Sequence, residues 1–64
     1  MGIADKTMDH TAYPKSLRSK DTDSVRFIAK DAKEAAEANP TNPNVGYYLD
    51  EAIYANAELR RRGA

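Results

Sequence analysis

The sequence contains no cysteine, no tryptophan and only one histidine, His10. Without cysteine the chain has neither disulfides nor thiolate metal ligands, on which many domains of this size depend. A metal site would have to combine His10 with scattered carboxylates, which is not the ligand spacing of a typical protein metal site. The sequence therefore predicts neither a metal nor another cofactor.

Long hydrophobic runs and an excess of one charge are also missing. No apolar segment approaches the roughly 20 residues that span a bilayer, and the polar start of the chain does not read as a secretory signal. Ten Lys and Arg residues balance ten Asp and Glu residues, whereas general nucleic-acid-binding proteins are usually clearly basic. We therefore expect a cytoplasmic protein that neither enters a membrane nor binds DNA.

No group of residues has the arrangement of a catalytic site. Asp50 and Glu51 lie near Tyr54, but adjacent helical positions point about 100° apart, so the two carboxylates do not converge on one substrate atom. His10 stands in a polar leader without a spaced partner for nucleophilic catalysis. We therefore expect a binding protein and not an enzyme.

What the sequence does contain is two segments with the 3.6-residue apolar period of a helix. The first runs from about residue 21 to 38, with Asp21 as a capping residue. Its apolar stripe is mostly alanine: Val25, Ile28, Ala29, Ala32, Ala35 and Ala36. The second runs from about residue 43 to 62, with Asn42 as its cap and Pro43 as its first residue. One face of this helix carries Leu49, Ala52, Ile53, Asn56 and Leu59.

Asn39 and Pro40 mark the break between the two helices. Asn39 suits the left-handed residue that often ends a helix, and Pro40 cannot continue one. So short a connection predicts an all-α fold in which residues 21–62 form an antiparallel αα-hairpin, followed by a tail at residues 63–64. Gly46, in the first turns of the second helix, indicates either a close approach of another group or a position that simply tolerates glycine.

Residues 1–20 are predicted to form an N-terminal arm that is flexible or packs against the hairpin. Its first part is polar and should be ordered only where Ile3 or Met8 finds a hydrophobic groove. The proline after Tyr13 pushes that residue toward an extended backbone. The basic stretch that follows, with Leu17 as its apolar anchor, indicates either a helical turn or an arm laid across the hairpin.

The alanine-rich stripes make the predicted core thin. Its anchors are Val25, Ile28, Val45, Leu49, Ile53 and Leu59. At ~1.5–3 kcal/mol for each fully buried large side chain, they offset only part of the cost of ordering two helices. Aromatic side chains are typical interface anchors, so we predict a homo-oligomeric helical bundle with Phe27, Tyr54 and Leu59 at its interface. The alternative is a monomer whose tyrosines lie flat on its own surface.

A basic arm lies directly before the first helix and contains Lys15, Arg18 and Lys20. Because a helix N-terminus has free N–H groups and a positive dipole end, bases beside it favour an anion or phosphate site. Tyr13, with Tyr47 or Tyr48, would offer a ring on which a nucleobase stacks. These six residues are the predicted ligand-binding set. The alternative is a solvated basic linker.

Charge is distributed unevenly along the chain. Residues 21–58 carry three bases and eight acids, whereas the segments on either side are net basic. The three arginines at residues 60–62 either bind phosphate, RNA or an acidic protein surface, or simply complement the negative C-terminal dipole of the second helix.

In overall appearance the chain is short, free of cysteine, helical and charge-balanced, and in this it resembles the small accessory proteins that bacteriophages encode. The resemblance implies a stoichiometric binder that acts in the host cytoplasm and counters host defence, by blocking a host protein or by sequestering a nucleotide immune signal. Two functions are therefore expected as alternatives. One is sequestration of a phosphorylated nucleotide at an intersubunit site. The other is binding of a protein partner through the face of the second helix that carries Tyr47 and Tyr54.

Overall fold

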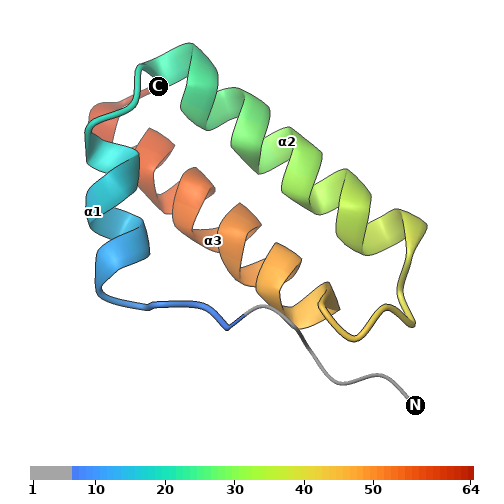
Figure 1. Ribbon diagram of the computed structural model, residues 1–64. Coiled ribbons are helices and arrows are strands. Elements are labelled where there is room, and N and C mark those ends of the chain that lie inside the picture. The colour runs from blue at the N-terminus through green and yellow to red at the C-terminus, as the bar shows by residue number, and fades with distance from the viewer. Residues whose placement is uncertain (1–6) are drawn as a thin grey trace.

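The computed structural model describes residues 7–64, and within that range it contains three α-helices and no strand (Figure 1). The helices are α1 (Ala12–Arg18), α2 (Thr22–Ala38) and α3 (Val45–Arg62). The predicted all-α class is confirmed. Of the two residues expected to anchor the leader, Met8 is buried, and Ile3 lies outside the described residues.

α2 and α3 lie side by side and run in opposite directions, and α1 packs beside the end where α2 begins and α3 finishes (Figure 1). The Cα atoms extend over 40 × 23 × 14 Å. The smallest of these dimensions corresponds to two packed helices, whose axes lie about 8–10 Å apart and whose Cα atoms add about 2.3 Å on either side. Along its shortest axis the molecule is therefore no thicker than two packed helices. Each helix keeps one side open to solvent.

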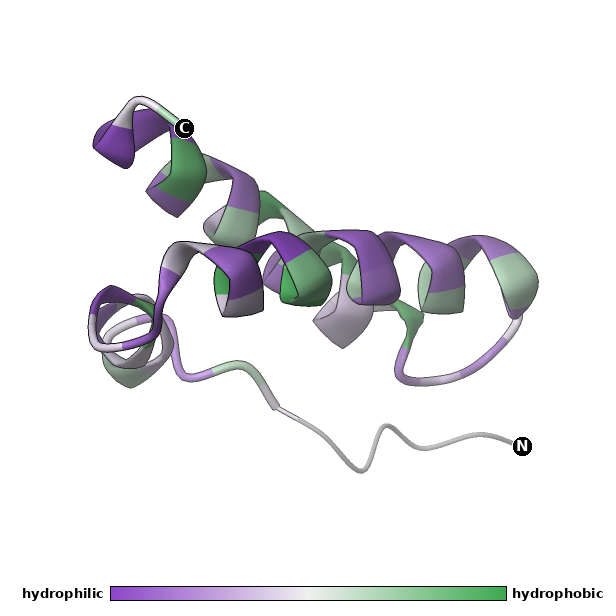
Figure 2. Ribbon diagram, turned by 90° about the horizontal axis from the view of Figure 1, so that it is seen from above, coloured by the Kyte–Doolittle hydropathy of each residue, from purple (hydrophilic) through white to green (hydrophobic). Residues whose placement is uncertain are grey.

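The core lies where the three helices meet. Leu17 of α1 and Val25 of α2 are fully buried there, and Ala29 and Ala55 complete the cluster. The partly buried side chains around this centre are Tyr13, Ile28, Tyr54 and Leu59. Apolar and polar residues alternate along both long helices (Figure 2), as expected for helices with one buried side.

The apolar stripe predicted for the first long helix is confirmed. The buried residues of α2 are Val25, Ala29, Ala32 and Ala36. Three of the four buried residues of α2 are therefore alanine, whose small side chain buries little area.

The apolar face predicted for the second long helix is only partly correct. Ala52 is buried and Leu59 packs against the core as predicted, but Leu49 and Ile53, expected as core anchors, are 49% and 61% exposed. Ala55 and Glu58, which were not predicted on this face, are buried in their place. The reason is that α3 packs against α1 as well as against α2. A helix with two neighbours buries the side that faces both, and this leaves Leu49 and Ile53 in solvent.

The basic stretch of the arm is a helix, α1, and Tyr13 within it is helical and not extended. Pro14 stands in the first turn, where its missing N–H would have no helical partner in any case. Asp9 caps this turn, because its Oδ1 accepts hydrogen bonds from the N–H groups of Ala12, at 2.8 Å, and Thr11, at 3.0 Å. These two bonds stabilise the carboxylate and lower the pKa of Asp9.

The connection between α2 and α3 also differs from the prediction. α3 begins at Val45 and not at Pro43, with Asn44 as its N-cap. Asn42 does not cap the helix, since its Oδ1 accepts a hydrogen bond of 2.7 Å from the N–H of Asn44 and closes a local turn. Asn39, expected in the left-handed region, has a φ of −134°.

α3 ends at Gly63, whose φ of 75° lies in the left-handed region. The N–H of Gly63 donates to the carbonyl of Arg60 at 3.1 Å, and the N–H of Ala64 donates to the carbonyl of Leu59 at 2.9 Å. This is the Schellman motif, which glycine favours because it has no Cβ to strain.

Gly46 and Gly63 should respond in opposite ways to alanine. Among the described residues, a Cβ at position 46 would meet nothing within 4 Å, so within residues 7–64 this glycine marks no close approach. Gly46→Ala should raise the free energy of unfolding by roughly 0.4–1 kcal/mol, and Gly63→Ala should lower it by about 1–2 kcal/mol because alanine is strained at positive φ. Urea unfolding followed by circular dichroism measures both changes, and a loss of stability in Gly46→Ala would contradict the first.

Candidate functional site

Tyr13, predicted to stack on a nucleobase, lies in the contact between α1 and α3. Its hydroxyl donates a hydrogen bond of 3.2 Å to Oε2 of Glu51, and its ring centroid is 6.1 Å from that of Tyr54. Burial, and then the negative charge of Glu51, raise the pKa of the Tyr13 phenol. Tyr13 is therefore a packing residue whose hydroxyl is satisfied inside the protein.

The other tyrosines are also engaged within the chain. The hydroxyl of Tyr54 is hydrogen-bonded to Nδ1 of His10 at 2.7 Å, and the two ring centroids are 5.8 Å apart. Tyr47 and Tyr48 are half-buried and form an edge-on ring pair with centroids 6.2 Å apart. The tyrosine-bearing face of α3 is thus partly covered by α1 and by the segment that precedes it.

The bases predicted for the ligand site are spread over the surface of α1 and the residues just after it. Lys15, Arg18 and Lys20 are all exposed. Arg18 lines a small groove of about 140 Å³ between α1 and α3, together with Tyr54 and Arg61. Ligand pockets usually measure about 300–1,000 Å³, so this groove is smaller than a typical small-molecule site.

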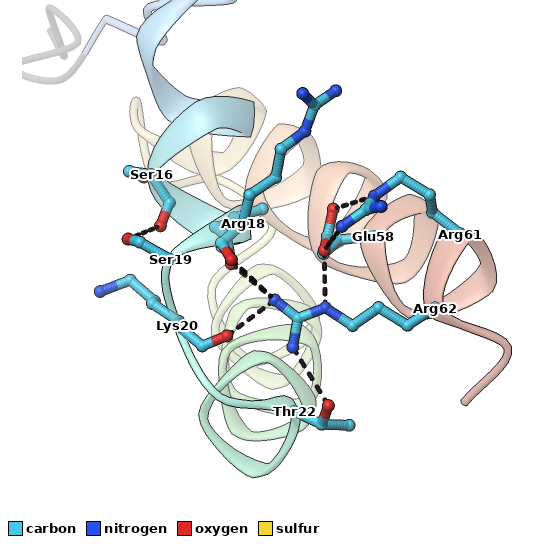
Figure 3. A network of polar contacts seen from close by, with 9 residues as sticks. Ser16, Arg18, Ser19, Lys20, Thr22, Glu58, Arg61 and Arg62 are labelled. Atoms are coloured by element: carbon cyan, nitrogen blue, oxygen red, sulfur yellow. Dashed lines mark hydrogen bonds and ion pairs between the residues drawn. The ribbon is translucent and has the colours of Figure 1, made fainter.

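Arg62 connects all three helices (Figure 3). Its Nε donates to Glu58 of α3 at 2.6 Å, and its Nη1 donates to Oγ1 of Thr22, at the start of α2, at 3.1 Å. Its Nη2 donates to three backbone carbonyls at and just after the end of α1: Leu17 at 2.9 Å, Arg18 at 3.4 Å and Lys20 at 2.7 Å. Carbonyls at a helix C-terminus lack the helical donors that interior carbonyls have. One side chain of α3 therefore caps α1 and contacts α2.

Glu58 is the carboxylate that balances this guanidinium, and it is only 6% exposed. Arg61 donates to both of its oxygens, at 3.0 and 2.7 Å. The hydrogen bonds from Arg61 and then Arg62 lower the pKa of Glu58 to about 2. Glu58 is therefore ionised at neutral pH although it is covered. The i, i+3 and i, i+4 spacing of these residues is the sequence signal for such pairs.

The three arginines at residues 60–62 thus differ in their surroundings. Arg60 is exposed, Arg61 is paired with Glu58, and Arg62 binds the carbonyls of another helix. Neither interpretation drawn from the sequence, an anion site or a complement to the helix's own dipole, describes the contacts of Arg62.

A larger groove, of about 370 Å³, lies between α2 and α3. We call it the α2–α3 groove, and it is lined by Arg26, Ala29, Lys30, Lys33, Asn56 and Leu59. Its lining therefore includes three bases and no acid. Leu59 was predicted to lie at an interface, whereas the bases belong to none of the predicted sites. Their i, i+4, i+7 spacing places them on one side of α2, which is the signal that could have found them.

Next to this groove, α3 presents apolar side chains to solvent. Leu49 and Ile53 are one turn apart, and Ile53 comes three residues before Asn56 of the groove, so the three follow one side of the helix. We call Leu49 and Ile53 the α3 stripe. Phe27, also predicted at an interface, is 67% exposed. It comes three residues before Lys30, as Ile53 comes three residues before Asn56, so on α2 it lies beside the α2–α3 groove.

Comparison with known protein families, with curated proteins and with solved structures finds no match to the chain. Among the described residues, no helix is long and apolar enough to span a membrane. The same part of the chain has no grouping of three His, Cys, Asp or Glu side chains around a possible metal position. Function is therefore argued from the α2–α3 groove and the α3 stripe.

Replacing Arg62 should destabilise the fold more than replacing Arg61. Arg62→Ala removes the donors to the α1 carbonyls and to Thr22, and we expect a loss of about 1.5–3 kcal/mol, the value of a charge-assisted hydrogen bond. Arg61→Ala is the matched control, because it removes hydrogen bonds within α3 alone and leaves Glu58 its hydrogen bond from Arg62. Urea denaturation compares the two variants. Equal losses would show that Arg62 does not join the helices.

Glu58 should make stability depend on pH in the acid range. Its pKa in the folded chain is about 2, below the ordinary value of 4.5. The ionised carboxylate therefore stabilises the fold above pH 4.5, and this contribution is lost as the pH falls from 4.5 toward 2. The melting temperature of the wild type should decrease over that interval.

Glu58→Gln is the comparison for this prediction, because glutamine does not titrate. Its melting temperature should fall less steeply over the same interval. Some slope should persist, since the Ala12 and Thr11 N–H groups lower the pKa of Asp9 and the Ser24 hydroxyl lowers that of Asp21. Identical slopes in variant and wild type would contradict the role of Glu58.

Proposed function

We propose that this protein is a non-enzymatic binding protein that recognises a protein partner through the α3 stripe and the α2–α3 groove. The observation that supports this is the exposure of Leu49 and Ile53, at 49% and 61%, beside an open groove. Large apolar side chains that lie together in solvent and are rimmed by polar groups are typical of interaction surfaces. Full burial of such a side chain contributes ~1.5–3 kcal/mol, and because Leu49 and Ile53 are already about half covered, a partner would add about half of this for each.

In this proposal the working unit is a helical hairpin of α2 and α3, and α1 is its brace. α1 occupies the side of α3 that carries Tyr54 and Glu58. The α3 stripe and the α2–α3 groove are on sides that α1 leaves open. The hairpin therefore presents a binding surface without giving up the contacts that hold it together.

The homo-oligomer expected from the sequence stays a prediction, in addition to the proposed binding of a protein partner. Its physical basis is a thin core, since alanine makes up five of the eight buried hydrophobic residues in the described range. A domain with so little buried area gains stability when association covers more of it. A second copy is therefore the main competitor for the α3 stripe.

Sequestration of a phosphorylated nucleotide is the second candidate function. The α2–α3 groove favours it, because its volume of about 370 Å³ and its three bases suit a small anionic ligand. The residues suggested by the sequence give it less support, since Tyr13 is engaged with Glu51. A thermal shift screen with mono-, di- and cyclic nucleotides tests it, because a ligand of the folded state raises the melting temperature. A role in countering host defence rests, for either function, on the resemblance to phage accessory proteins.

A photoreactive residue in place of Ile53 should capture the partner. Benzoylphenylalanine at this position faces the proposed surface, whereas the same residue in place of exposed Lys15 lies on α1, away from that surface, and is the matched control. In the cells where the protein acts, irradiation should give one adduct of fixed mass from position 53 and none of that mass from position 15. Mass spectrometry identifies the captured chain.

Two results would overturn the proposed function. The first is the same adduct from both positions, or none from position 53. The second is an adduct with twice the 7.1 kDa mass of the chain, which would show that a second copy covers the α3 stripe.

A further inference from the structure

Every base between residues 21 and 58 lines the α2–α3 groove. This segment has three bases and eight acids. All three bases, Arg26, Lys30 and Lys33, belong to the groove lining, and no acid does. The groove lining is thus basic within an acidic segment, while Glu34 and Glu37 lie one turn from Lys30 and Lys33 outside the lining. A basic lining favours a partner of opposite sign.

The three bases are free to meet such a partner. Nη1 of Arg26 is 3.3 Å from Oδ1 of Asp23, but both side chains are exposed, and a pair of this kind is weak in water. Lys30 and Lys33 are exposed. Within the described part of the chain they form no ion pair and no hydrogen bond.

We propose that the α2–α3 groove binds an acidic amphipathic helix of a partner protein. This inference rests on the proposed function and adds the chemistry of the partner. Arg26, Lys30 and Lys33 are spaced i, i+4 and i+7 and so span about 10 Å along α2. Acidic residues at the same spacing on a partner helix face these bases in turn. The apolar side chains next to them on that helix lie on Leu59 and Ile53.

Two other occupants suit the groove less well. Two copies that met groove to groove would bring bases against bases, and like charges across an interface are unfavourable. A nucleotide would find no aromatic ring in the lining on which its base could stack. An apolar strip beside a row of bases is the pattern that an amphipathic helix matches.

The probe for this proposal is a synthetic, fluorescein-labelled amphipathic peptide of about 18 residues, long enough to form a helix. It carries glutamates at i, i+4 and i+7 and leucines on the neighbouring stripe. Its control has glutamine in place of each glutamate. Fluorescence anisotropy with the whole 64-residue chain should show saturable binding of the acidic peptide, at least about tenfold tighter than the control and weaker in high salt.

Charge reversal in the groove is the decisive variant. Lys30→Glu combined with Lys33→Glu should weaken binding of the acidic peptide by at least about tenfold. Lys15→Glu combined with Lys20→Glu reverses two exposed bases of the arm and should change the affinity by no more than about twofold. Circular dichroism checks the fold of each variant. If the groove variant does not fold, Lys30→Gln with Lys33→Gln carries the same test.

Several results would overturn the inference. One is an equal loss of affinity in the groove pair and the arm pair, and another is equal binding of the acidic and glutamine peptides. Nucleotide binding that depends on Lys30 and Lys33, without peptide binding, would assign the groove to a nucleotide. If the peptide fails while position 53 still captures a protein, the partner's chemistry is wrong and the proposed function stands. If both experiments fail, the proposed function falls as well.

Discussion

The guanidinium of Arg62 is the contact on which the arrangement of the three helices depends. It lies among Glu58 of its own helix, Thr22 at the start of α2 and the carbonyls that end α1. α1 has only seven residues, and a helix so short is not stable by itself in water. By binding the end of α1, Arg62 keeps Leu17 in the cluster with Val25. This is the place where side chains larger than alanine are fully buried.

The same contact decides which side of α3 faces solvent. A rotation of α3 that buried the exposed half of Leu49 and Ile53 would gain about half of the ~1.5–3 kcal/mol that full burial contributes for each side chain. It would also turn Glu58 and Arg62 away from α1, and a covered carboxylate that loses its partners is strongly unfavourable. α3 therefore packs alanines against α2 and keeps its charged pair toward α1. The α3 stripe is exposed because α3 is rotated in this way.

The positions of the two long helices along the chain are predicted well from the sequence. The rotation of each helix about its own axis is predicted less well. α2 is predicted correctly because its apolar and polar sides differ clearly. α3 has apolar residues on more than one side, so its period does not say which side meets a neighbour. Its second neighbour, α1, was predicted only as either a helical turn or an arm laid across the hairpin. α1 is hard to predict from the sequence because it contains Pro14. Proline breaks a helix interior but is tolerated in a first turn. In the sequence, the bases of the groove are indistinguishable from an ordinary solvent-exposed side of a helix. Only the position of α3 beside α2 shows that they line a groove.

Exposure of Leu49 and Ile53 does not by itself require a partner, because it follows from the constraint at Arg62. The independent feature is that all three bases of an acidic segment line one groove. Helix packing does not demand this, since lysine and glutamate have similar helix propensities at exposed positions. Folding therefore accounts for the exposed α3 stripe but not for the three bases of the α2–α3 groove. These bases are the observation that favours an acidic partner over other proteins with an apolar patch.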